Sequence, residues 1–177
     1  LLGVAALTTA GQAAVLYYLS GYLFTTLAAF AVIVIVMRHL ESEDIGGLAG
    51  LHQRSPLLAA TLTLAMVSLA GIPPLAGFFG KFLLLKAIIE QGAANHGYYC
   101  LAFTALVGVV ISFYYYFGVI KAIYFGKGAN DVSPIPMSLP MKAAVCVCVA
   151  GMFWLGVAPG SLLRAAEQAA LLLGAAH

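Results

Sequence analysis

The residue best suited to chemistry in this sequence is Lys81, a lone cation inside a long apolar run. It is the only charged residue between Arg54 and Lys86, and it stands four residues after the Gly- and Pro-rich segment 71–77. A lysine at the centre of a membrane helix costs roughly 3 kcal/mol on insertion scales, so an intramembrane lysine is a functional-site hypothesis by default. The chemistry that we expect of Lys81 is the binding and release of a proton.

An alternative role for Lys81 is structural. Its side chain would then snorkel to an interface or pair with an acidic residue elsewhere in the protein. The central position of Lys81 in the apolar run disfavours snorkelling, because a four-carbon stem does not reach far. Lys86 lies about one and a half turns further along, next to Glu90, and we expect that side chain to snorkel.

Gly71, Pro73, Pro74 and Gly77 are expected to break the helix that carries Lys81. A continuous helix over 56–90 would be roughly 50 Å long at ~1.5 Å per residue, against about 30 Å of hydrocarbon. The two prolines remove two backbone donors, whereas the two glycines let the chain turn back into helix. Broken helices build ion sites at the bilayer midplane, and the carbonyls that end the first half-helix favour an ammonium.

The composition places the chain among membrane proteins. Hydrophobic residues make up 63% of it and charged residues 8%, which excludes an ordinary soluble domain. The net charge of +2 is spread over connecting segments, so no basic stripe is available for nucleic acid. Cys100, Cys146 and Cys148 are too few for an iron–sulfur or zinc site, which needs about four ligands, and we expect free buried thiols.

The apolar segments predict an all-α polytopic helix bundle. The expected elements are a truncated helix over about 1–9, spans over 13–37, 56–90 (broken), 97–125 and 141–158, and a short helix over about 161–176. The last helix is amphipathic and is expected to lie on the membrane surface. Lysine and arginine are in excess around the loops 38–55 and 126–140, so both should face the cytoplasm. With no initiator Met, the chain is interpreted as a fragment.

Several hydroxyl-bearing residues inside the spans are weaker candidates for a hydrated proton path to Lys81. They recur at helical spacing or lie close to the break. They are Tyr18, Tyr22, Thr25, Ser68, Ser112 and Tyr115. Ordinary hydrogen bonding between helices explains them equally well, and the three tyrosines at 114–116 are more typical of an interfacial belt or a packing group.

Residues 68–82, SLAGIPPLAGFFGKF, resemble the antiporter-like membrane subunits of proton-pumping NADH:quinone oxidoreductase, respiratory complex I, and subunit N most closely. The agreement extends to residues 18–24, to the loop at 44–56 and to the tyrosines at 114–116. The resemblance implies an antiporter-like fold of two inverted repeats, each with one broken helix, of which this chain is the C-terminal third. Subunit M usually has a glutamate where Lys81 stands and subunit L continues into a lateral helix, so Lys81 and the end at His177 favour N.

By this resemblance, Lys81 is the terminal lysine of the family's proton path, whose earlier members lie outside the chain. The chain would be a proton-translocating, non-redox subunit with no cofactor or metal of its own. NADH, flavin, iron–sulfur clusters and quinone would lie in partner subunits. The implied partners are the other membrane-arm subunits and the lipid bilayer, in a bacterial inner membrane. Two alternatives are a large subunit of a multisubunit cation/proton antiporter, which shares this fold, and a structural spacer in which Lys81 is permanently paired.

Overall fold

The computed structural model describes residues 2–6, 8–39, 44–93, 95–126 and 133–174, and all regular structure in these ranges is helical. The elements in chain order are α1 (Leu2–Ala5), α2 (Thr9–Met37), the 3-10 helix η1 (Ile45–Leu48), α3 (Leu51–Arg54), α4 (Pro56–Ala70), α5 (Ala76–Gln91), α6 (Gly97–Phe125), α7 (Leu139–Val157) and α8 (Gly160–Gly174). The predicted all-α fold with a broken helix is confirmed, and the break lies between Ala70, where α4 ends, and Ala76, where α5 begins.

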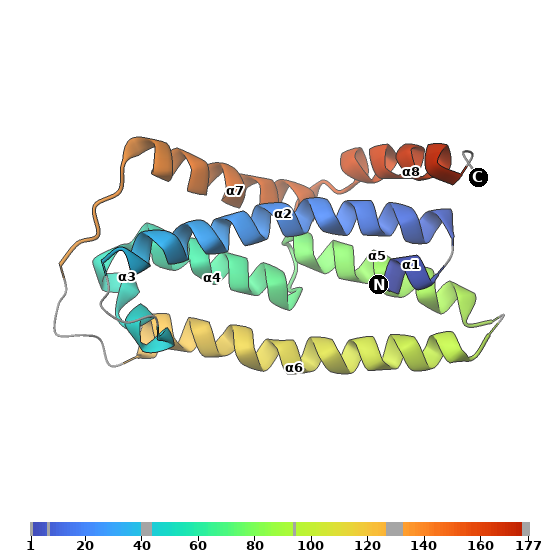
Figure 1. Cartoon of the computed structure of the whole chain (residues 1–177), viewed down its shortest axis with the longest axis horizontal. Coiled ribbons are helices and arrows are strands. Elements are labelled where there is room, and N and C mark those ends of the chain that lie inside the picture. The colour runs from blue at the N-terminus through green and yellow to red at the C-terminus, as the bar shows by residue number, and fades with distance from the viewer. Residues whose placement is uncertain (1, 7, 40–43, 94, 127–132, 175–177) are drawn as a thin grey trace.

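The long helices run along one common axis, with α2 in the middle of the bundle (Figure 1). α4 and α5 follow one another along one side of α2, and α7 and α8 follow one another along the other. α6 packs against α4 and α5. Within the described residues, α2, α6 and α7 are long and apolar enough to cross a membrane, so the protein is an integral membrane protein.

The connecting segments that are rich in lysine and arginine lie at one end of the bundle. The end of α2, helix α3, the end of α6 and the start of α7 lie at one end, and these elements carry or adjoin Arg38, Arg54, Lys121 and Lys142. The α5–α6 connector, which has no lysine or arginine, lies at the opposite end (Figure 1). The elements that flank the two positively charged loops thus lie at the same end of the bundle, as they must if both loops face the cytoplasm.

The start of α2 differs from the sequence-based prediction. A truncated helix over about 1–9 and a separate span from residue 13 were expected, but α2 begins at Thr9 and runs without interruption through residue 13. Thr8 causes the earlier start, because its side-chain oxygen accepts a hydrogen bond from the Gly11 N–H at 3.0 Å. This is N-cap geometry, which satisfies one of the free donors of the first turn.

A helix over about 161–176 was expected on the membrane surface; in the structure α8 begins at Gly160 and packs against α2. It lies lengthwise along the first half of α2 (Figure 1). Ala13 of α2 and Ala166 and Ala170 of α8 form a buried cluster there, with Leu16 packed against it. Small side chains let two helix backbones approach closely, and this alanine stripe is the physical reason for the docking.

The largest apolar core lies where α2, α4 and α7 meet. Its centre includes Val32, Leu62 and Met152, each with no exposed surface. Cys100 and Cys146 lie outside this core with exposed side chains, so the expectation of buried thiols is wrong for these two residues.

Candidate functional site

The break between α4 and α5 begins at a glycine cap. α4 ends at Ala70, and Gly71 follows with a φ of +89° in the left-handed region. The Gly71 N–H donates to the carbonyls of Val67 and Ser68, and the Ile72 N–H donates to Val67. Glycine adopts a positive φ without the strain that a Cβ would cause, so Gly71 ends the helix as predicted.

The two prolines free two particular carbonyls. In a continuous helix the N–H of residue i bonds the carbonyl of residue i−4, so Pro73 and Pro74 would have been the donors to Leu69 and Ala70. Lys81 replaces both donors. Its Nζ donates to the Leu69 carbonyl at 2.6 Å and to the Ala70 carbonyl at 3.1 Å. The ammonium group therefore caps the end of α4 with the hydrogen bonds that the prolines cannot make.

The glycines of the break also make room. A Cβ on Gly71 would lie 3.0 Å from the Lys81 Cδ, so this glycine accommodates the lysine stem as well as the turn. Gly77 was expected to help the chain turn, but it lies inside α5, after Ala76. A Cβ on Gly77 would collide with the Ser68 carbonyl, so its role is close approach between the two half-helices.

A cavity of about 300 Å³ opens beside Lys81, between α2, α4, α5 and α6. Its polar lining consists of Tyr18, Tyr22, Thr25, Ser68, Lys81, Ser112 and Tyr116. The structure thus brings the sequence-selected residues of α2, Ser68 of α4 and Ser112 of α6 to one cavity with the lysine.

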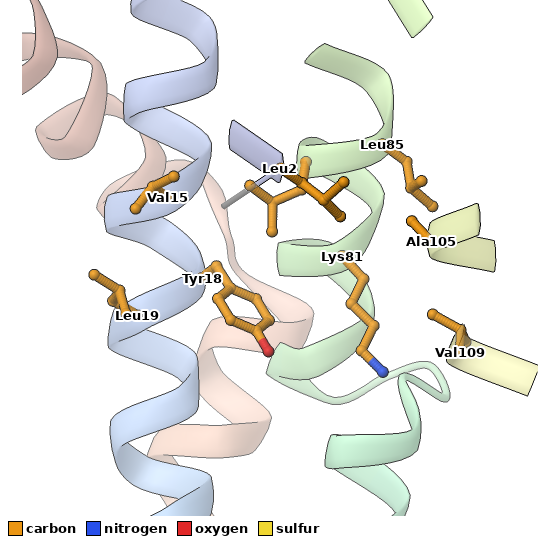
Figure 2. Close-up of a pocket in the computed structure, with 9 residues that line it drawn as sticks. Leu2, Val15, Tyr18, Leu19, Lys81, Leu85, Ala105 and Val109 are labelled. Atoms are coloured by element: carbon orange, nitrogen blue, oxygen red, sulfur yellow. The ribbon is translucent and has the colours of Figure 1, made fainter. Parts of the chain in front are cut away.

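A second, more apolar cavity of about 370 Å³ also has Lys81 and Tyr18 in its wall. Figure 2 shows Tyr18 on α2 and Lys81 on α5 reaching in the same direction, toward the break. Aliphatic side chains such as Leu84 and Val109 make up most of the remaining wall. The lysine therefore stands between an apolar space and a hydroxyl-lined one.

Tyr115, which the sequence analysis selected as a candidate path residue, is not brought to the cavity. Tyr115 is 66% exposed and does not line the cavity, whereas its neighbour Tyr116 does. Successive residues of an α-helix point roughly 100° apart, so only one of two adjacent tyrosines faces a given cavity. Tyr116 was missed because the run of aromatic residues at 113–117 carries no periodicity from which the inward face can be identified.

Lys86 has a different environment from Lys81. Its Nζ lies 3.8 Å from Glu90 Oε1, one turn along the same helix, and both side chains are more than half exposed. In the part of the chain that the structure describes, Lys81 has carbonyl oxygens and no carboxylate as its hydrogen-bonding partners. Across those same residues, no three His, Cys, Asp or Glu side chains come together as a metal site.

Comparison with known proteins assigns the chain to a family. A family model described as NADH:quinone oxidoreductase/Mrp antiporter, TM matches residues 1–112. NADH-quinone oxidoreductase subunit N of Phocaeicola vulgatus is 39% identical over 164 residues, covering 90% of this chain and 33% of that protein. Subunit N of Desulfitobacterium hafniense is 42% identical over 160 residues, covering 90% and 31%.

A solved structure agrees with these relatives. A chain of respiratory complex I from Thermus thermophilus with bound Aureothin superposes with a TM-score of 0.67 at 29% identity, covering 88% of this chain and 36% of that one. The chain spans about a third of the length of the curated relatives that it matches. The resemblance found in the sequence is confirmed.

Proposed function

The chain belongs to the family of transmembrane proteins that NADH:quinone oxidoreductases and Mrp antiporters share, and we propose that it is part of the proton-translocating subunit N of a NADH:quinone oxidoreductase. The relatives named as subunit N and the similarity to a chain of respiratory complex I support this assignment. NADH, flavin, iron–sulfur clusters and quinone then belong to partner subunits. This chain contributes proton transfer across a bacterial inner membrane, in contact with the other membrane-arm subunits.

One observation carries the proposal: the Lys81 ammonium caps two carbonyls at a helix break and also faces a hydroxyl-lined cavity. An ammonium has three N–H donors and a neutral amine has two. Two N–H groups of the Lys81 side chain satisfy the Leu69 and Ala70 carbonyls in either protonation state. The third proton, which only the ammonium carries, is the one that Lys81 exchanges with the cavity. Losing this proton leaves neither carbonyl without a donor, so the site is compatible with both states.

Coupling to the rest of a complex requires only a nearby charge. Two like charges ~6 Å apart at an effective dielectric of about 20 interact by nearly 3 kcal/mol. A positive charge that arrives beside Lys81 therefore expels its proton, and withdrawal of that charge allows Lys81 to be protonated again. In this mechanism Lys81 takes protons from the hydroxyl-lined cavity and releases them toward one face of the membrane.

The test uses the intact complex in inverted membrane vesicles, with proton pumping and NADH-driven electron transfer measured side by side. We expect Lys81→Ala to lower both together while the complex remains assembled. Lys86→Ala is the matched control, because this lysine is exposed and paired with Glu90, and it should retain both activities. Wild-type pumping by Lys81→Ala would contradict the proposal.

A second candidate function follows from the breadth of the family, whose description includes Mrp antiporters. A cation/proton antiporter subunit would exchange cations for protons in vesicles that receive neither NADH nor quinone.

A purely structural role for Lys81 is tested by Lys81→Met, which removes the charge and keeps the length of the side chain. Retained pumping in that variant would favour the structural role.

A further inference from the structure

Helix α5 has no N-cap of its own. Its first turn follows Leu75, whose side chain has no oxygen to accept a hydrogen bond, although the first N–H groups of a helix need acceptors. The Gly77 N–H donates to the Ser68 Oγ at 3.3 Å instead. A serine on α4, nine residues earlier, thus performs for α5 the task that an N-cap side chain usually performs.

The hydroxyl of Ser68 belongs to a chain of hydrogen bonds whose direction is determined. The Thr25 Oγ1 donates its single proton to the Gly21 carbonyl at 2.8 Å. Ser68 must therefore be the donor in its 3.1 Å contact with Thr25. The chain runs from the Gly77 N–H to Ser68, then to Thr25, and ends at the Gly21 carbonyl.

Both hydroxyls are buried, and this makes their hydrogen bonds costly to lose. Ser68 has no exposed surface and Thr25 is 1% exposed. A buried polar group without a partner retains its full desolvation penalty, so each hydroxyl holds its neighbour in place. Three helices, α2, α4 and α5, are joined at this one point.

The Gly77–Ser68–Thr25 chain of hydrogen bonds lies close to Lys81 and to its carbonyl acceptors. Ser68 immediately precedes Leu69, the carbonyl to which Lys81 donates at 2.6 Å. Gly77 lies four residues before Lys81, which is about one helical turn. The distance between the freed carbonyls and the helix that carries the lysine is therefore set where Ser68 meets Gly77.

We propose that Ser68 is a positioning residue that caps α5 across the break and holds Lys81 in register with the Leu69 and Ala70 carbonyls, with Thr25 anchoring it to α2. This proposal rests on the function proposed above. It assigns to Ser68 a role other than membership of the proton path. The chain of hydrogen bonds from Ser68 through Thr25 ends at the Gly21 carbonyl, which has no proton to pass on.

The experiment measures turnover per assembled complex and the KM values for NADH and quinone, in inverted vesicles. The variants are Ser68→Ala, Ser68→Thr, Thr25→Val and Thr25→Ser. Ser20→Ala is the matched control, because among the described residues the Ser20 hydroxyl bonds only the Leu16 carbonyl of its own helix. The expected result is a severalfold loss of kcat at unchanged KM in Ser68→Ala and Thr25→Val. Ser68→Thr and Thr25→Ser, which keep the hydroxyl, should recover most of the loss.

Lys81→Ala is measured beside these variants so that the two proposals fail separately. If Lys81→Ala loses pumping while Ser68→Ala and Thr25→Val keep wild-type kcat, the positioning role is overturned and the proton-transfer role stands. If Lys81→Ala itself pumps at the wild-type rate, the proposed function fails first. Should Ser68→Ala not assemble, Thr25→Val decides, because it keeps the cap on Gly77 and removes only the anchor. Wild-type kcat in that variant overturns the proposal.

Discussion

The Nζ atom of Lys81 lies 2.6 Å from the carbonyl oxygen of Leu69, twelve residues earlier in the chain. The carbonyl is free because Pro73, the residue four positions after it, has no N–H. The charged side chain and the helix break are therefore parts of one structural unit: the break supplies the acceptor, and the lysine supplies the donor. Carbonyls at a helix C-terminus also carry partial negative charge, which favours the ammonium.

Replacing Pro73 tests this unit directly. Pro73→Ala restores an N–H that competes with Lys81 for the Leu69 carbonyl. A backbone hydrogen bond contributes about 1 kcal/mol net, which corresponds to roughly a fivefold change in an equilibrium constant. We expect proton pumping per assembled complex to fall by about that factor, measured in inverted vesicles.

Pro56→Ala is the control for this change. Pro56 is at the first position of α4, where a proline lacks only an N–H that would have no partner within the helix. Its replacement should leave pumping unchanged. Equal losses in Pro56→Ala and Pro73→Ala would show that the freed carbonyl is not the cause.

We expect the adjacent residues Tyr17 and Tyr18 of α2 to differ in role, with Tyr17 supporting stability and Tyr18 supporting proton pumping. The Tyr17 hydroxyl is buried and donates to the Leu155 carbonyl, whose helical donor would have been Pro159. Tyr17→Phe leaves that carbonyl without its donor, and we expect a loss of roughly 1–3 kcal/mol in stability. Thermal denaturation of the purified complex measures it, as a lower transition temperature.

Tyr18→Phe provides the contrast to Tyr17→Phe. The Tyr18 side chain lines both cavities beside Lys81. We expect this variant to keep the wild-type transition temperature and to pump more slowly. If Tyr18→Phe destabilised the complex as much as Tyr17→Phe, the Tyr18 hydroxyl would be a packing group.

Gly156 of α7 packs against the break itself. A Cβ at this position would collide with the Pro74 carbonyl. Overpacking of this kind costs typically about 1–3 kcal/mol, and here it would push α7 away from the break. We expect Gly156→Ala to lower the yield of assembled complex, measured by native gel electrophoresis of solubilised membranes.

Gly118→Ala on α6 is the matched substitution for Gly156→Ala. A Cβ at Gly118 meets no described atom within 4 Å, so assembly should be retained. Normal yield of Gly156→Ala would mean that α7 and the break adjust to the added methyl group without cost.

The tyrosine pair of α6 tests which residue faces the cavity. Tyr116 lines it, and Tyr115 is 66% exposed. We expect Tyr116→Phe to slow pumping by roughly two- to fivefold, the equivalent of a neutral hydrogen bond of about 0.5–1 kcal/mol, and Tyr115→Phe to have no effect. If Tyr115→Phe slowed pumping in the vesicle assay and Tyr116→Phe did not, Tyr115 would be the path residue.

Much of this site was predictable from the sequence because it depends on covalent properties that no neighbour alters. Proline lacks an N–H in any fold, glycine accepts a positive φ, and a lysine in hydrocarbon is costly wherever it stands. Those facts identify Gly71, Pro73, Pro74 and Lys81. Span lengths follow equally directly from the thickness of the bilayer, which is why the helix order was predictable.

Only the tertiary structure decided which faces of the helices meet. The membrane-crossing helices α2, α6 and α7 are apolar on all sides, so no contrast between polar and apolar residues marks the buried face of α6 or the side of α2 that α8 covers. The selection of Tyr116 over Tyr115, the docking of α8 through Ala166, and the contact of Ser68 with Thr25 depend on packing between segments far apart in the chain. In lipid, where helices associate by shape and hydrogen bonds, such contacts exist only once the helices are together.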